Sequence, residues 1–132
     1  MKKLFLGLGL GLGICVLCAS NARAGNKASY PISVSSTAAN GQVANVRASS
    51  GSVAFITCWT EASGTSVDSY VTCIGRDSSG VQKSCLSRQA SFIAVASSIN
   101  GDSYIDFGTD EGSNFCSWLE VENGSTMAPK AP

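Results

Sequence analysis

Residues 53–85, VAFITCWTEASGTSVDSYVTCIGRDSSGVQKSC, decide the fold of this chain. Residues 53–60 are dense in β-branched and aromatic side chains, which favours a strand. The polar segment 61–66 interrupts this pattern, residues 67–74 resume it, and the turn residues DSSG precede a short strand expected over residues 81–85. The stretch therefore predicts an antiparallel meander.

The turns of this meander also predict how its strands are aligned. A hairpin centred just after Thr65 places Cys58 directly opposite Cys73, and a hairpin centred on Ser79 places Cys73 opposite Cys85. Directly opposed residues project from the same face of a sheet. We therefore expect the three sulfur atoms to lie in one row.

The N-terminus has the layout of a secretory signal peptide. Lys2 and Lys3 form a cationic start, residues 4–18 are an apolar run, and small residues stand at the −3 and −1 positions before the expected cleavage between Ala24 and Gly25. The apolar run is shorter than the roughly 20 residues that a membrane-spanning helix needs. We expect residues 1–24 to be removed, leaving an exported chain with no membrane span, in the periplasm or outside the cell.

The mature chain keeps four cysteines, Cys58, Cys73, Cys85 and Cys116. An even number in an exported domain of this size predicts two disulfides. Cys73 can bond to only one of its two neighbours in the row. We favour Cys58–Cys73 with Cys85–Cys116, and the competing pairing, Cys73–Cys85 with Cys58–Cys116, stays open.

The flanking segments complete the predicted domain. Residues 25–40 are polar and indicate a loose arm or an edge strand that ends in a turn, and residues 42–48 alternate weakly, as a strand would. Residues 87–100 have apolar residues at helical spacing, with Ser87 as an N-terminal cap and Gly101 as a C-terminal cap. A buried strand over residues 92–96 is the alternative.

A last hairpin is expected from residues 103–107 and 115–121, joined by the loop DEGSN. Alternation places Phe115, Leu119 and Val121 on one expected core face. Residues 123–132 are expected to be a flexible tail. The whole predicts a small α+β domain over residues 41–122, in which an antiparallel sheet of about five to seven strands packs against one short helix; an all-β sandwich is the alternative.

Charge and composition restrict the function. After cleavage six basic and nine acidic residues remain, a net charge of −3, which is not the electrostatic footprint of a protein that binds nucleic acid or anionic membranes. The chain has no histidine and no nucleophile motif, so we expect neither enzymatic activity nor a cofactor or metal.

The acidic residues offer two alternatives to this expectation. Carboxylates gather in the last hairpin region, at Asp102, Asp106, Asp110, Glu111, Glu120 and Glu122, where a carboxylate-dependent hydrolase is the less favoured alternative. Oxygen donors around its loop also suit calcium, but their spacing is not that of an EF-hand. A solvated acidic turn explains the pattern as well.

Aromatic residues supply the remaining candidates for binding. Trp59, Tyr70, Tyr104 and Trp118 fall on expected strands. On an exposed sheet face such residues stack on sugars or anchor a protein partner, although aromatic residues serve equally well in cross-strand packing.

Three stretches, YVTC (residues 70–73), SYIDF (residues 103–107) and CSWLEVENGS (residues 116–125), are similar to small secreted bacterial proteins with two disulfides and no assigned activity. The resemblance implies export and two bridges, and it transfers no catalytic or binding residue. The hypothesis is therefore an exported binding or surface protein with a protein or glycan partner; the alternative is a secreted inhibitor or effector that acts on a partner enzyme. The sequence leaves the oligomeric state open.

Overall fold

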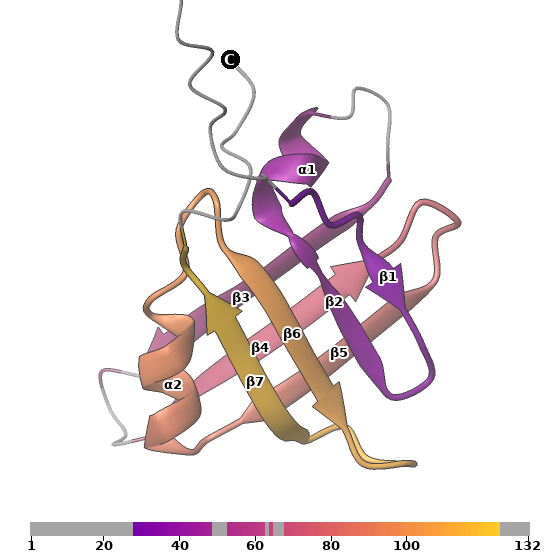
Figure 1. Ribbon diagram of the computed structural model, residues 1–132. Helices are drawn as coiled ribbons and strands as arrows, with labels where there is room; N and C mark the ends of the chain where they lie inside the picture. Colours follow the sequence, from indigo (N-terminus) through magenta and orange to yellow (C-terminus); the bar gives the residue numbers. More distant parts are fainter. Residues whose placement is uncertain (1–27, 49–52, 63, 65–67, 125–132) are drawn as a thin grey trace, which may run out of the picture.

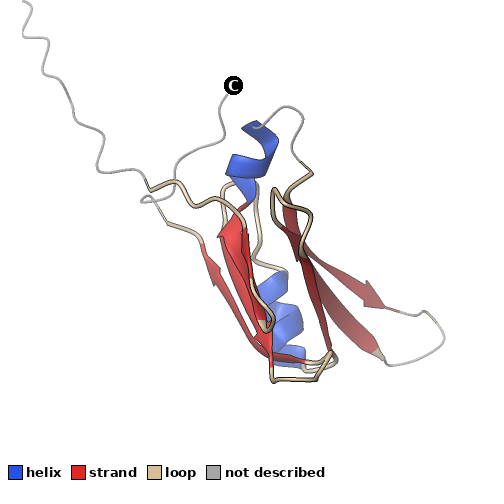
Figure 2. Ribbon diagram, turned by 90° about the vertical axis from the view of Figure 1, so that its right-hand side faces the viewer, coloured by secondary structure: helices blue, strands red, loops and turns tan. Residues whose placement is uncertain are grey.

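Two antiparallel sheets face each other in the computed structural model, which describes residues 28–48, 53–62, 64 and 68–124 (Figures 1 and 2). One sheet has the strand order β1-β2-β6-β7 and the other the order β3-β4-β5. Their bounds are β1 Ser33–Val34, β2 Ala38–Gln42, β3 Phe55–Ala62, β4 Ser69–Arg76, β5 Gln82–Ser87, β6 Tyr104–Thr109 and β7 Cys116–Glu122, with helices α1 Val43–Ala48 and α2 Ala90–Ala96.

This architecture confirms a small domain of antiparallel strands with few helices and two disulfides. The strands number seven, at the upper end of the expected range, and they divide into two sheets where the sequence led us to expect one. The facing sheets are the feature that the sandwich alternative predicted. Among the described residues no helix is long and apolar enough to cross a membrane.

The meander β3-β4-β5 has the predicted register. Cys58 lies opposite Cys73, and Cys73 lies opposite Cys85. The structure contains the disulfides Cys58–Cys73 and Cys85–Cys116, the pairing that was favoured. The first staples a hairpin, and the second joins the two sheets.

The weakly alternating segment that followed residue 41 was expected to be a strand, and this was wrong. Strand β2 ends at Gln42, which pairs with Tyr104, the first residue of β6. Among the described residues no strand continues β6 before Tyr104, and the chain turns into α1, which buries Ala44. The Val43 amide donates to the Ser103 carbonyl at this junction.

Part of the expected N-terminal arm is ordered in the four-stranded sheet. Strand β1 pairs with Ala39 and Asn40 of β2, and the Ser35 hydroxyl accepts from the Ala38 amide in the turn between them. Asn40, at the end of the segment 25–40 where a turn was expected, lies inside β2.

A bulge in β7 changes which of its residues face the core. Gly108 pairs with Trp118 but Thr109 pairs with Cys116, so Ser117 is an extra residue on β7. The shift turns the Cys116 side chain inward and the preceding Phe115 outward. Phe115 is 68% exposed, so its predicted place in the core was wrong, whereas Leu119 packs against the core.

Helix α2 occurs in the region predicted to be helical, but it is shorter and has other caps. Gln89 is its N-cap, and the expected capping residue Ser87 belongs to β5 and accepts a hydrogen bond from the Gln89 amide. The C-cap is Ser97, which precedes Gly101 by one turn, and its hydroxyl donates to the Ile93 carbonyl.

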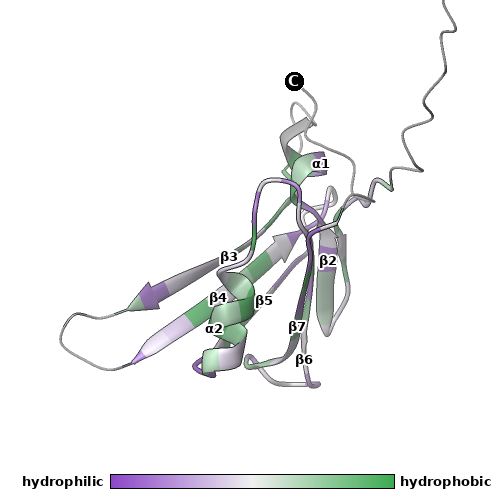
Figure 3. Ribbon diagram, turned by 60° about the vertical axis from the view of Figure 1, so that its left-hand side comes forward, coloured by the Kyte–Doolittle hydropathy of each residue, from purple (hydrophilic) through white to green (hydrophobic). Residues whose placement is uncertain are grey.

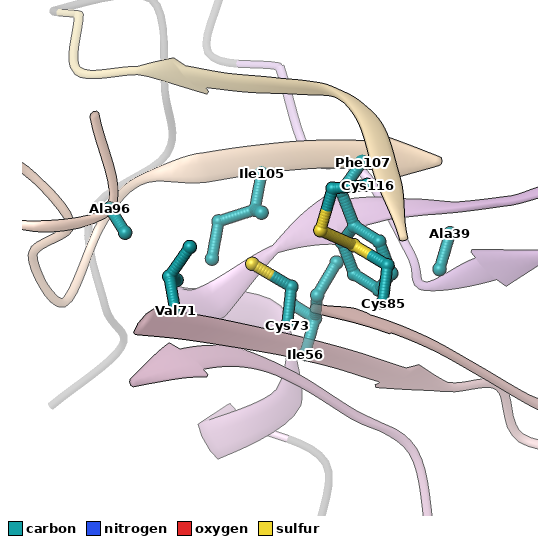
Figure 4. Close-up of a cluster of buried hydrophobic side chains, with 9 residues drawn as sticks. All are labelled: Ala39, Ile56, Val71, Cys73, Cys85, Ala96, Ile105, Phe107 and Cys116. Atoms are coloured by element: carbon teal, nitrogen blue, oxygen red, sulfur yellow. A yellow bond between two sulfur atoms is a disulfide. The ribbon is translucent and has the colours of Figure 1, made fainter. Parts of the chain in front are cut away.

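The sheets meet closely at one end and diverge toward α2 at the other (Figure 3). Gly75 of β4 faces Ala39 of β2, and a Cβ atom on Gly75 would lie only 2.7 Å from the Ala39 Cβ. Helix α2 fills the wider end with Ala96. The buried cluster between the sheets is Ala39, Ile56, Val71, Cys73, Cys85, Ala96, Ile105, Phe107 and Cys116 (Figure 4).

The expected signal peptide, its cleavage site at Ala24 and Gly25, and most of the expected tail lie outside the described residues. The start of that tail is held in place. The Asn123 side chain accepts hydrogen bonds from the Ser103 hydroxyl and from Nδ2 of the Asn100 side chain, and it donates to the Ser98 carbonyl.

Candidate functional site

The strands β3, β4 and β5 present one side to the core and the other outward. Because Ile56, Cys73 and Cys85 are buried in the core, the residues that alternate with them project from the opposite side. We call this side the outer face; it consists of Phe55, Thr57, Trp59 and Glu61 on β3, Tyr70, Thr72, Ile74 and Arg76 on β4, and Gln82, Ser84 and Leu86 on β5.

The middle of the outer face carries large apolar side chains, with hydroxyl-bearing ones between them. Trp59, Thr72 and Leu86 form one cross-strand row, and Ile74 lies in the next row. Phe115 extends the first row, because it pairs with Leu86 in an isolated bridge and points away from the core. Trp59 is 45% exposed, while Ile74 and Leu86 are half-buried by their neighbours.

Polar contacts close one end of this apolar area. The Arg76 guanidinium lies 5.2 Å from the centre of the Phe55 ring, a cation–π contact. The same guanidinium donates to the Gln82 amide oxygen from Nε at 3.1 Å and from Nη2 at 2.6 Å. These contacts span all three strands in one row.

The opposite end of the outer face is polar as well. Glu61 and Tyr70 are cross-strand neighbours, and their hydrogen bond raises the pKa of the Tyr70 hydroxyl above its usual value, because ionisation would place two negative charges together. Arg88 forms an exposed ion pair with Asp68 at 3.9 Å. Such an exposed pair contributes little to stability, about 0–1 kcal/mol, but it defines the polar border.

A hollow of about 390 Å³ lies beside the β5 edge of the outer face. Leu86 and Phe115 line its apolar part, and Arg88 and Gln89 line its polar part. The hollow therefore suits a partner group that combines an apolar side chain with a neighbouring hydrogen-bond acceptor.

The four predicted aromatic residues do not gather on one surface. Trp59 and Tyr70 lie on the outer face, whereas Tyr104 and Trp118 lie on the far side of the other sheet. The sequence did not identify Phe115, Leu86 and Ile74 as surface residues. The predicted cross-strand register already placed Leu86 beside Trp59 and Thr72, so alternation in the meander could have found it.

Trp118 and Tyr104 have structural contacts. The Trp118 ring lies over Gly108, and its Nε1 donates to the Asp106 carboxylate at 3.2 Å. The Tyr104 ring packs edge-on against Tyr30, with centres 5.1 Å apart. Burial and the nearby carboxylate of Asp106 raise the pKa of Tyr104.

The acidic residues of the last hairpin are spread along it. Asp106 and Glu120 are cross-strand neighbours on the far side of the four-stranded sheet, and Asp110 and Glu111 are exposed in the turn. Within the described part of the chain no group of three or more Asp, Glu, His or Cys side chains is placed to hold a metal ion.

Comparison with known proteins supplies no relative: no family model, no curated protein and no solved structure matches this chain.

Proposed function

We propose that this chain is an exported, non-enzymatic binding protein that engages a protein partner through the outer face of the β3-β4-β5 sheet. The observation that carries the proposal is the cross-strand row of Trp59, Thr72 and Leu86, which Phe115 extends and which polar contacts flank on both sides. An apolar centre with a polar rim is the anatomy of a protein interface.

The composition of the row favours a protein over a glycan. Tryptophan is enriched among the residues that carry binding energy in protein interfaces, and here Trp59 shares a row with Leu86 and Phe115 across Thr72. In contrast, the row contains neither a carboxylate nor an amide, the groups that would bind sugar hydroxyls by hydrogen bonds. On the outer face these groups lie outside the row, at Glu61 and Gln82, where they bond to Tyr70 and Arg76. The two disulfides support the proposal further, because a stapled sheet loses little conformational entropy on binding.

Site-specific photo-cross-linking in the producing cells tests this function. A photoreactive phenylalanine analogue at Leu86 is expected to cross-link a defined exported or surface protein. The same analogue at Glu120, on the far side of the other sheet, is the matched control and is expected to give no such product. Both positions lie on strands and outside the core, Leu86 half-buried and Glu120 exposed.

A competition step identifies the residues responsible. Excess purified protein is expected to abolish the Leu86 product, whereas the Trp59→Lys variant at the same concentration is expected to compete poorly. Equal cross-linking from Leu86 and Glu120, or equal competition by Trp59→Lys, would contradict the proposal.

A further inference from the structure

Within the described parts of the chain, strand β3 is the edge of its sheet and pairs only with β4. Residues Trp59 to Ala62 of this strand are all exposed, because the β3–β4 hairpin extends beyond the facing sheet and α2 (Figures 2 and 3). A strand edge of this kind offers a row of backbone donors and acceptors to another strand.

A hydrogen bond on the opposite edge of the sheet shows which backbone groups point to the open edge of β3. The Leu86 amide donates to the Asn114 carbonyl, so the Leu86 backbone faces away from β4. The side to which the N–H and C=O groups point alternates from residue to residue along an antiparallel strand. The backbone of Cys85 therefore hydrogen-bonds to that of Cys73, and the N–H and C=O groups of Cys73 point away from Cys58. The N–H and C=O groups of Cys58 and Thr60 therefore point to the open edge of β3.

The β3 edge carries few of the usual features that prevent strand pairing. Its sequence, FITCWTEA, has no proline and no basic residue, and its pairing with β4 runs without a bulge. Natural edges are commonly protected by lysine, proline or a bulge. Here the only charged residue is Glu61.

We infer that β3 pairs with β3 of a second copy of this chain, antiparallel about a two-fold axis, with Trp59 opposite Trp59 of the second copy. In this register Cys58 and Thr60 exchange backbone hydrogen bonds with their counterparts in the other copy. Glu61 then lies opposite Thr57, so no two carboxylates face each other. A register centred on Glu61 would place the two carboxylates together and is disfavoured.

The consequence is a continuous six-stranded sheet made of two three-stranded ones. The apolar rows of the two copies join at the axis, where the two Trp59 rings meet from non-hydrogen-bonded positions, the closer of the two antiparallel pair types. The dimer thereby doubles the outer face, but it depends only on the β3 edge and forms without any other partner.

The substitution Thr60→Pro tests the dimer at the backbone. Proline removes the outward N–H group of Thr60 but no ladder bond to β4, so the hairpin is expected to form. Thr60→Val is the matched control, because it keeps the N–H group. Light scattering coupled to size exclusion, run over a concentration series of the disulfide-bonded protein, measures the dissociation constant.

The native chain and Thr60→Val are expected to dimerise, and Thr60→Pro is expected to weaken the dimer by about thirtyfold, because two symmetry-related hydrogen bonds of about 1 kcal/mol each are lost. Trp59→Lys, which places two like charges opposite each other, is expected to give a monomer and covers the case in which Thr60→Pro does not fold. A native chain that is monomeric throughout the series, or a dimer that survives both Thr60→Pro and Trp59→Lys, overturns the inference. Photo-cross-linking from Leu86 reports on the proposed function separately, since Leu86 lies two strands away from this edge.

Discussion

Replacing Gly75 by alanine is expected to destabilise the protein, because the added methyl group would force the two sheets apart. The new methyl group would lie 2.7 Å from the Ala39 Cβ and 3.7 Å from Ile56 Cδ1. The first distance is far inside van der Waals contact. Because a Cβ atom is fixed to its backbone, Ala39 cannot rotate away, and strand β2 or β4 must move.

The magnitude follows from this geometry. Overpacking a well-packed core costs about 1–3 kcal/mol, and a rigid backbone-linked contact belongs in the upper half of that range. We therefore expect Gly75→Ala to lower the free energy of unfolding by about 2–3 kcal/mol. Ala39→Gly alone is expected to cost about 1–2 kcal/mol, from the lost buried methyl group and the greater chain entropy of glycine.

The double variant separates the clash from other effects. With Ala39→Gly present, the methyl group at position 75 has room, so the two changes are expected to be coupled by about 2 kcal/mol in the favourable direction. Urea unfolding of the disulfide-bonded protein, followed by circular dichroism, measures all four forms. Gly64→Ala is the control, since a Cβ there would contact nothing within 4 Å.

Additive effects of Gly75→Ala and Ala39→Gly would refute the reasoning. So would a Gly75→Ala protein as stable as the control variant. Either result would mean that the sheets do not meet at this pair.

Three further predictions concern the remaining sheet, the disulfides and a turn. In Gly108→Val the new Cβ would lie 2.1 Å from atoms of the Trp118 ring, so the ring is expected to leave the sheet, which a change in tryptophan fluorescence would report. Cys85→Ser is expected to cost more than Cys58→Ser, about 3.7 against about 3.0 kcal/mol in the chain-entropy model, because the two bridges span 31 and 15 residues; equal losses in denaturant titration would contradict this. Hydrogen bonds from the Ser79 hydroxyl and from backbone amides lower the pKa of the Asp77 carboxyl. The stabilisation by Asp77 is therefore present above its unfolded pKa of about 3.9 and is lost as the pH falls through the lower folded pKa. An NMR titration of the Asp77 carboxyl with a normal midpoint would refute this assignment.

Local patterns in the sequence were sufficient to predict the β3-β4-β5 meander. Turn residues around Thr65 and Ser79 set the register that brings Cys58, Cys73 and Cys85 into one row, and both registers are present in the structure. They could be predicted because a hairpin register depends only on where its turn lies. The surface row through Trp59 and Leu86 follows from the same register.

Where the sequence-based prediction was wrong, the structure of the segment depends on a neighbour that is distant in the chain. Residues 43–48 form a helix because β6 begins at Tyr104 and offers no further strand partner to β2. Phe115 is exposed because the bulge at Ser117 reverses the alternation of β7. Neither cause is visible in the residues of the segment itself.

By itself, the sequence determined the strand-rich class, the meander and its register, and the row of three cysteines, because each follows from local periodicity and turn chemistry. The tertiary structure decided which sulfur atoms bond, how the strands divide into two sheets, and which aromatic residues share a surface. Cys73 lies opposite two cysteines, and the choice between them depends on Cys116, which reaches Cys85 only because the bulged β7 turns it inward across the gap between the sheets. Such a contact joins residues far apart in the chain, and its energy comes from packing that no single segment contains.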